Sequence, residues 1–169
     1  EILLARSFKL GAVRLTDRFF STDALHPSAL SSCRKFVRSM LATIKPEVLE
    51  LGFEIAVGSS GSVEAVAKLI RKLNDEPELK SYNRCEFSAK DVTKMLDLLA
   101  DAPTVKERAR IFDLDSSRAE IILAGAVILE GIAQSFDVTK FTYSDYALRE
   151  GVLFDTLARE KLLDNPEDF

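Results

Sequence analysis

The residues best suited to chemistry form a short glycine and serine segment, Gly58-Ser59-Ser60-Gly61-Ser62. An apolar run precedes this segment, and residues with helical spacing follow it. Glycine lets a ligand approach the backbone closely, and amides at the start of a helix carry partial positive charge. The segment is compatible with a phosphate site, although spacing alone favours a plain serine-capped turn between a strand and a helix. It matches neither the Walker A pattern nor GxGxxG.

A second candidate for anion binding is Arg118, which lies in the first turn of a predicted long helix. A cation at this position opposes the helix dipole, and a bound anion would relieve the conflict. From this position alone, a solvated surface arginine is the favoured interpretation. Asp113 and Asp115 share the DxD spacing of a phosphatase nucleophile loop. A charged, helix-like stretch precedes them instead of an apolar strand, so we interpret them as a turn.

Other catalytic arrangements are not supported by the sequence. The single histidine, His26, lies beside Pro27 and is expected in a surface turn, with no nucleophile in evident partnership. Cys33 and Cys85 form no Cx2C pair and cannot complete a zinc site with one histidine. We expect both to be free, buried thiols in a reducing compartment.

The 169 residues are 47% hydrophobic and 30% charged, which is ordinary for a globular domain. A net charge of -4 argues against a general nucleic-acid binder, although a local basic pocket remains compatible with it. Arg34, Lys35 and Arg38 form one candidate basic stripe, for which a solvated helix face is the favoured interpretation. The longest apolar stretch, residues 121–129, is shorter than a membrane span, and no signal peptide is evident.

The elements that must position these residues alternate along the chain, which predicts an α/β fold. Strands are expected at Ile2–Phe8, Phe53–Val57, Asn83–Ser88 and Lys140–Ser144. Helices are expected at Ser28–Ile44 (ended by Pro46), Ser62–Leu73, Ser88–Leu99, from Thr104, from Ser117 to about Phe136, and at Ala147–Leu163, with a helix or loop at Ala12–Phe20. Three of these helices are expected to begin at capping boxes, which pair Ser88 with Asp91, Thr104 with Glu107 and Ser117 with Glu120. The predicted phosphate loop thus joins a strand to a helix.

Four segments, in this order, resemble the second domain of the Ppx/GppA family of exopolyphosphatases and guanosine pentaphosphate phosphohydrolases. They are Leu10–Phe19, Gly58–Ala65, Arg118–Ala126 and Ser144–Leu153. The resemblance covers nearly the whole chain, with Glu120 where relatives often have Asp and Ser62 where Thr is common. It implies a ribonuclease-H-like α/β domain of the actin-like ATPase superfamily, in which helices flank a mixed sheet.

The resemblance further implies that residues 1–169 are the second of two domains. Phosphate would lie between two glycine loops, one from each domain, and Gly58 to Ser62 match the second-domain loop. The first-domain loop, of Asp-Ile-Gly-Gly-Gly-Ser type, and the glutamate general base do not occur in this sequence. Glu1 would be the last residue of that loop. Arg118 would pair with an anionic substrate, and no residue of this fragment would be catalytic.

The expected function is that of an exopolyphosphatase, which removes the terminal phosphate of inorganic polyphosphate with Mg²⁺, in the bacterial cytoplasm. The fragment alone is expected to be inactive. The alternatives are a guanosine pentaphosphate 5'-phosphohydrolase, or an isolated non-catalytic domain for phosphate binding or dimerisation. The expected partners are the substrate and the first domain of the same protein. No membrane or nucleic-acid partner is expected, and a homodimer is left open.

Overall fold

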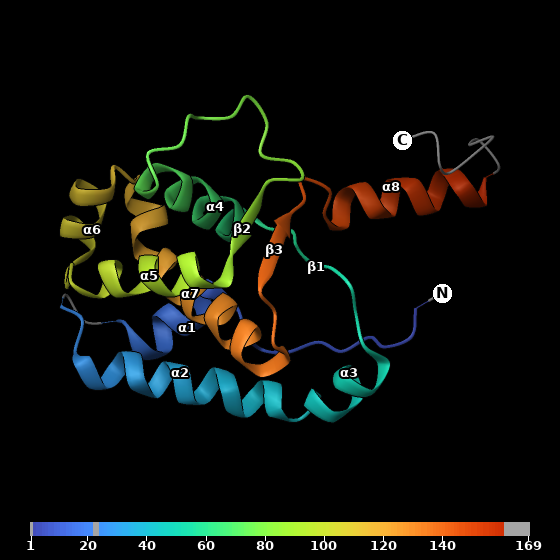
Figure 1. The fold of residues 1–169 in the computed structure, drawn as a ribbon, viewed down its shortest axis with the longest axis horizontal. Helices are drawn as coiled ribbons and strands as arrows, with labels where there is room; N and C mark the ends of the chain where they lie inside the picture. The colour runs from blue at the N-terminus through green and yellow to red at the C-terminus, as the bar shows by residue number, and fades with distance from the viewer. Residues whose placement is uncertain (1, 22–23, 161–169) are drawn as a thin grey trace.

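The computed structural model describes residues 2–21 and 24–160, in which helices surround a small sheet (Figure 1). The helices are α1 (Ala12–Phe19), α2 (Pro27–Ala42), α3 (Lys45–Leu51), α4 (Gly61–Leu73), α5 (Ala89–Ala100), α6 (Val105–Phe112), α7 (Ser116–Phe136) and α8 (Leu148–Arg159). The strands are β1 (Ala56–Gly58), β2 (Glu86–Ser88) and β3 (Lys140–Tyr143). This confirms the predicted α/β class.

The sheet is mixed, and its strand order is β1-β3-β2. β1 runs parallel to β3, with Ala56 opposite Phe141 and Gly58 opposite Tyr143. β2 runs antiparallel to β3, and the rings of Phe87 and Phe141 stack with their centroids 5.6 Å apart. β1 is therefore an edge strand. Its last residue, Gly58, begins the predicted phosphate loop.

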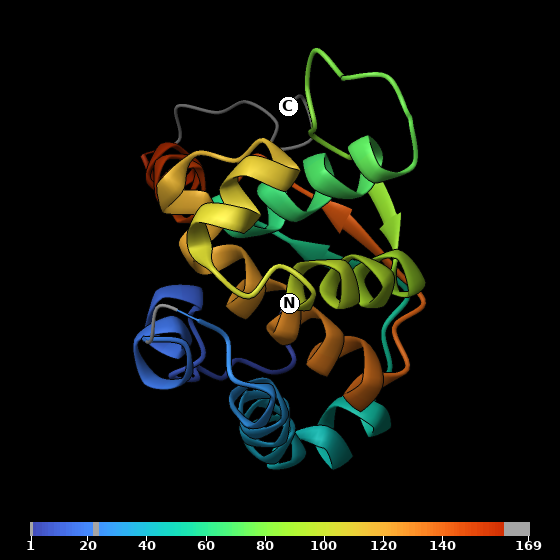
Figure 2. The same ribbon diagram turned by 90° about the vertical axis from the view of Figure 1, so that its left-hand side faces the viewer.

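The long helix α7 is the centre of the hydrophobic core. It packs against α1, α2, α3, α4, α5 and α6. α1 and α2 lie on one side of it, whereas the sheet, α4 and α6 lie on the other (Figures 1 and 2). Gly131 allows α2 to come close, because a Cβ atom there would lie 2.5 Å from Cγ1 of the buried Val37. This packing places the start of α4 against α7, where the predicted site lies.

The length and composition of α7 would also suffice to cross a membrane, with a mean hydropathy of 1.5 over its most apolar stretch. However, 72% of that stretch is buried inside the molecule. A core helix surrounded by other helices needs apolar residues on all its faces. The central position of α7 therefore accounts for its composition.

One expected strand is absent. Residues 2–10, which include the strand predicted at Ile2–Phe8, lie outside the sheet. Alternating apolar and polar residues favour an extended backbone, but a strand also needs a neighbouring strand as its hydrogen-bond partner. The strand expected at Phe53–Val57 is confirmed in part, since β1 covers Ala56–Gly58.

Several helix ends differ from the predictions. Pro46 does not end α2 but lies in the first turn of α3, where a proline leaves no N–H unpaired. The N-cap of α7 is Asp115, not Ser117, because the carboxylate of Asp115 reaches the first free amides of the helix. The expected extension of α8 to Leu163 lies outside the described residues.

The candidate basic stripe on α2 is interrupted. Arg34 donates two hydrogen bonds, of 2.7 and 2.9 Å, to the carboxylate of the buried Glu130 on α7. Its guanidinium also lies 3.7 Å from Asp97. These two acids neutralise Arg34, which joins α2 to the core. Of the three basic residues of the stripe, Lys35 and Arg38 are exposed and Arg34 is partly buried. The stripe is not a track for a polyanion.

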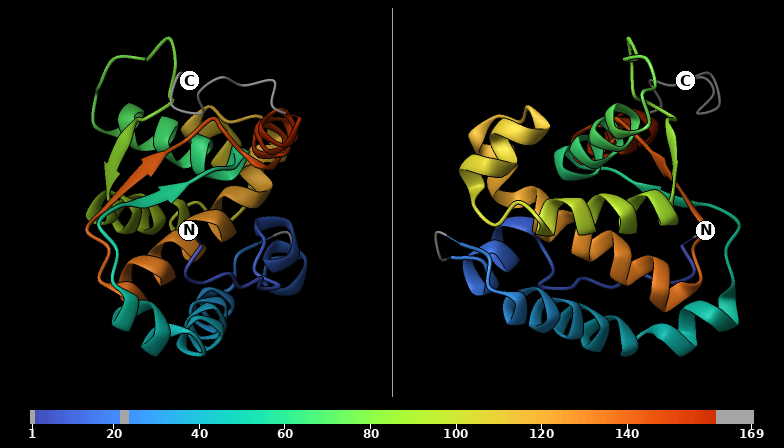
Figure 3. Two further views of the ribbon diagram at one scale, coloured as in Figure 1. Left: turned by 90° about the vertical axis from the view of Figure 1, so that its right-hand side faces the viewer. Right: turned by 60° about the vertical axis from the view of Figure 1, so that its left-hand side comes forward.

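An apolar groove of about 450 Å³ lies beside the edge strand. Its lining includes Ile2, Leu3, Leu51, Phe53 and Ile55, all of them exposed. The left view of Figure 3 faces this side of the molecule, where the N-terminal segment passes close to β1. α8 projects from the same side, away from the body of the molecule (Figure 1). Exposed apolar surface is thus concentrated on one side.

Candidate anion site at the start of helix α4

The glycine and serine segment connects β1 to α4, as predicted. Gly58 ends the strand, and its carbonyl accepts a hydrogen bond of 3.0 Å from the amide of Ser144. Ser60 is the N-cap of α4, and its hydroxyl accepts a hydrogen bond of 3.2 Å from the amide of Val63. A Cβ atom on Gly58 would lie only 2.9 Å from Cγ1 of Val63, so the turn requires glycine there.

The structure brings Arg118 to this loop, although Arg118 lies 57 positions after Gly61 in the sequence. A Cβ atom placed on Gly61 would lie 2.8 Å from Nη2 and 2.9 Å from Nη1 of Arg118. The guanidinium therefore lies directly against the first residue of α4. The partial positive charge of the helix start and the full charge of the arginine act at the same point.

The guanidinium of Arg118 has no hydrogen bond or ion pair with any residue in the described part of the chain. Its backbone amide donates a 2.9 Å hydrogen bond to the carboxylate of Asp115, the N-cap of α7. The side chain of Ser117 donates another to Asp115, at 2.6 Å. These two hydrogen bonds, with a smaller effect of the Arg118 charge, lower the pKa of Asp115. Asp115 thus holds the backbone of α7 and leaves the guanidinium unpaired.

A third helix start adjoins the site, and the sequence reasoning assigned it no role. A Cβ atom on the buried Gly125 of α7 would lie 3.4 Å from Cβ of Ser62 and 3.9 Å from Cβ of Ala12. The first turns of α4 and α1 thus meet at Gly125. No side chain caps α1, whose N-cap is Gly11, and its first turn holds no acidic residue. In the sequence, the resemblance of Leu10–Phe19 to the family was the feature that could have drawn attention to this helix start.

The five predicted loop residues have different surroundings. Ser59 and Ser60 are exposed, whereas Gly58, Gly61 and Ser62 are partly buried. The side chain of Ser62 packs against α7. The group that Ser62 would offer to a ligand is therefore its backbone amide. His26, which was expected in a surface turn, is the exposed N-cap of α2 and lies outside the site.

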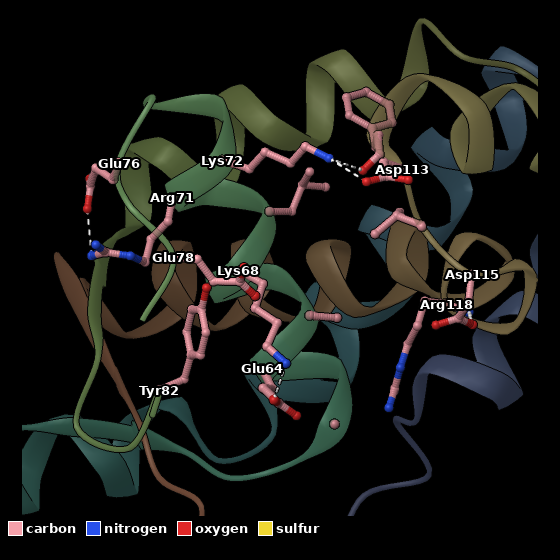
Figure 4. A pocket seen from close by; sticks show the side chains of 15 residues that line it. Glu64, Lys68, Arg71, Lys72, Glu76, Glu78, Tyr82, Asp113, Asp115 and Arg118 are labelled. Atoms are coloured by element: carbon pink, nitrogen blue, oxygen red, sulfur yellow. Dashed lines mark hydrogen bonds and ion pairs between the residues drawn. The ribbon is translucent and has the colours of Figure 1, made fainter. Parts of the chain in front are cut away.

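An open pocket of about 650 Å³ begins at Gly61 and Arg118 and extends along α4 (Figure 4). Its far end is formed by the segment after α4, which includes Glu76, Glu78 and Tyr82. The turn between α6 and α7 forms another wall. This turn was the DxD candidate, and the structure places it as a turn, with Asp113 paired to Lys72 at 3.1 Å.

The described residues do not form a metal site by themselves. No group of three or more His, Cys, Asp or Glu side chains gathers closely enough to hold an ion within residues 2–21 and 24–160. Cys33 and Cys85 are free and buried, as predicted, and burial raises the pKa of the Cys33 thiol to about 12. At the start of α4, the described residues therefore offer an anion the amides of the helix start and the guanidinium of Arg118.

Comparison with known proteins identifies the family of this chain. The sequence profile of the Ppx/GppA phosphatase family matches residues 1–160. A Haemophilus influenzae protein provisionally named an exopolyphosphatase is 26% identical over 152 residues, which are 90% of this chain and 45% of that protein. A guanosine-5'-triphosphate,3'-diphosphate pyrophosphatase of Pseudoalteromonas translucida is 25% identical over 93% of this chain and 30% of its own length.

Solved structures give the same result. The Aquifex aeolicus member of the Ppx/GppA family is 26% identical and superposes with a TM-score of 0.76 over 90% of this chain and 48% of its own. An exopolyphosphatase from Cytophaga hutchinsonii shares the fold, with a TM-score of 0.79 and 24% identity over 94% of this chain and 51% of its own. The chain belongs to the Ppx/GppA phosphatase family, and its ribonuclease-H-like α/β fold is confirmed. This chain spans about half the length of these two solved proteins. It spans a smaller share of the curated relatives.

Proposed function

We propose that this chain is the second domain of a phosphatase that removes the terminal phosphate of a phosphoanhydride, and that it supplies half of the phosphate site. One observation carries the proposal: the unpaired guanidinium of Arg118 lies against Gly61 at the start of α4. Membership of the Ppx/GppA family supports the reaction class. The other half of the protein would complete the site.

In this proposal the described residues bind and orient the phosphate. Amides of Gly61 and Ser62 donate to its oxygens, and Arg118 neutralises part of its charge. Positioning and charge stabilisation provide most of the catalysis in phosphoryl transfer. Water attacks the terminal phosphorus, and a glutamate in the other half accepts its proton. The oxygen of the leaving phosphate takes the electrons of the broken P–O bond.

Mg²⁺ has no ligand set of its own among the described residues, so we assign it no step. Magnesium usually binds through one or two carboxylates, several waters and the substrate phosphates. In the proposed enzyme it would take its ligands from the substrate and from the other half of the protein.

We place the contact with the other half of the protein at β1 and the apolar groove beside it. The relatives are about twice as long as this chain or longer, so a partner half is available in them. Val57 of the edge strand β1 is 61% exposed, and Ile55 is 66% exposed. Because β1 leads directly into the phosphate loop, a partner bound at this edge would reach the same site.

The proposed phosphate site is tested by Gly61→Asp, which places a carboxylate beside Arg118. Titration calorimetry with tripolyphosphate should show binding by the unchanged chain and none by the variant. Gly151→Asp is the matched control, because Gly151 lies in exposed α8 with open space around it. Equal binding by Gly61→Asp, with circular dichroism showing a folded chain in both variants, would contradict the site.

A further inference from the structure

Arg108 of α6 is charged but buried, with 3% of the residue exposed. Within the described part of the chain it forms no ion pair. Its guanidinium donates instead to three carbonyl oxygens. Nη1 lies 2.9 Å from the oxygen of Ala102 and 3.3 Å from that of Pro103, and Nε lies 3.2 Å from that of Ala119. Burial lowers the pKa of Arg108, because a charge held away from water is disfavoured.

Fold stability alone does not explain a charge at this position. An apolar side chain of similar length would fill the space without the desolvation cost, and such replacements of buried charges are often neutral or stabilising. An apolar side chain cannot donate hydrogen bonds in two directions, however. The planar guanidinium of Arg108 joins the turn between α5 and α6 to the first turn of α7. The charge therefore holds these two segments together.

A second buried donor reaches the same turn of α7 from the other side. Thr16 of α1 is 5% exposed, and its hydroxyl donates to the carbonyl of Glu120 at 3.4 Å. α1 and α6 lie on opposite sides of α7 (Figures 1 and 2). A carbonyl in a helix can accept a second hydrogen bond besides that of the helix itself. Ala119 and Glu120, whose carbonyls are held in this way, directly follow Arg118.

We propose that Arg108 and Thr16 are positioning residues, which hold the first turn of α7 so that the guanidinium of Arg118 meets an anion at Gly61. The proposal rests on the proposed function, because it takes that anion site as given. The guanidinium of Arg118 has no partner among the described residues, so its place depends on the backbone that carries it. A misplacement of about 1 Å at such a site can reduce function about 100-fold.

The test is a titration of the chain with tripolyphosphate, followed by NMR through the backbone amides of Gly61 and Ser62, which detects weak as well as tight binding. Arg108→Met keeps the length of the side chain and removes its donors. It should weaken binding about 10-fold. Arg110→Met is the matched control, because Arg110 is an exposed arginine of the same helix. It removes the same charge from α6 and should change binding less than about 2-fold.

A double-mutant cycle separates positioning from a general loss of structure. Arg118→Ala keeps the amides of α4 and therefore a weak binding of tripolyphosphate. In that background Arg108→Met should have no further effect, because the group that it positions is absent. A merely structural role would weaken binding by the same factor in both backgrounds, and that result would overturn the inference.

Thr16 allows the same test if Arg108→Met fails to fold, which circular dichroism would show. Thr16→Val keeps the branched shape without the hydroxyl, and it should weaken binding about 3-fold, the effect of one hydrogen bond. Thr16→Ser keeps the hydroxyl and should bind as the unchanged chain does. Equal binding by Thr16→Val and Thr16→Ser would overturn the role of Thr16.

The outcomes also separate this inference from the proposed function. Unchanged binding by Arg108→Met and Thr16→Val, with weakened binding by Arg118→Ala, would overturn the positioning role and leave the anion site intact. Unchanged binding by Arg118→Ala would contradict the anion site, and the positioning role with it.

Discussion

At Arg118, helix stability and ligand binding make opposite demands. The residue lies in the first turn of α7, where the helix dipole disfavours a cation, and that turn contains no acidic residue. Its guanidinium nevertheless lies against a second helix start, that of α4. Such an arrangement of positive groups is stable only when an anion joins it or water screens it. The conflict makes Arg118 the most informative single residue to change.

We expect Arg118→Ala to weaken tripolyphosphate binding about 10- to 100-fold, the effect of losing a charged hydrogen bond. The same variant should keep or raise the stability of the ligand-free chain, by up to about 1 kcal/mol, because it removes a cation from a helix start. Calorimetric titration and urea unfolding measure the two effects. Arg149→Ala is the control, since Arg149 is also in a first turn but is highly exposed and outside the pocket.

If Arg118→Ala bound tripolyphosphate as tightly as the unchanged chain does, the guanidinium would be a surface group without a ligand.

The sequence predicted the residue types of this site but not their contacts. Gly58 to Ser62 were identified from their position between a strand and a helix, and Arg118 from its unfavourable place in a helix. That Gly61 and Arg118 touch depends on how α4 packs on α7, and local patterns do not encode that packing.

At the scale of helices, the N-cap residues were predicted correctly where a short sequence pattern is enough to identify them. Thr104 and Glu107 form the expected capping box, in which each side chain binds the backbone amide of the other residue. Ser88 caps α5, also as expected. The cap of α7 was predicted two residues too late, because Asp115 and Ser117 are both good caps and only the path of the preceding turn decides between them.

The capping box predicts a pH dependence. Hydrogen bonds from the side chain and backbone of Thr104 lower the pKa of Glu107 below 4.5, its ordinary value. The folded state therefore binds this proton more weakly than the unfolded state. The resulting stabilisation is complete above pH 4.5 and is lost as the pH falls through the lowered pKa.

Thr104→Ala should reduce stability by about 1 kcal/mol at pH 7, and the deficit should shrink on acidification towards pH 3. Urea unfolding followed by circular dichroism at a series of pH values measures this. Ser39→Ala, an exposed residue of α2 that binds only a carbonyl of its own helix, provides the comparison. A deficit that stays constant down to pH 3 would show that the Glu107 carboxylate does not contribute.

The two glycines inside α7 should respond in opposite ways to alanine. Gly131→Ala should cost about 1–3 kcal/mol, because its Cβ would overlap the stiff, buried Val37. Gly125→Ala meets Ser62 at an ordinary contact distance of 3.4 Å. The better helix propensity of alanine should make this variant neutral or more stable, by up to about 1 kcal/mol. Thermal unfolding of both variants measures the difference. Equal losses would mean that α2 and α7 do not pack as described.

At the scale of the whole molecule, exposed apolar surface lies on the side of the edge strand β1. Val57 and the groove beside it lie there, and α8 projects from the same side (Figures 1 and 3). The sequence indicated a strand at residues 2–8, and the apolar residues that suggested it do line this groove. The sequence could not show that this segment lacks regular secondary structure, because a strand forms only beside a neighbouring strand. The family was predicted correctly because its four segments are specific only in combination.

The central claim is that this chain binds phosphate and that hydrolysis requires the other half of the protein. The most direct test is phosphate release from polyphosphate and from guanosine pentaphosphate, each with Mg²⁺, by this chain and by the longer protein that also carries the other half. We predict release by the longer protein and none by the chain alone, with Arg118→Ala reducing release in the longer protein. Release by the chain alone at a rate equal to that of the longer protein would contradict the account, because the general base would then lie within these 169 residues.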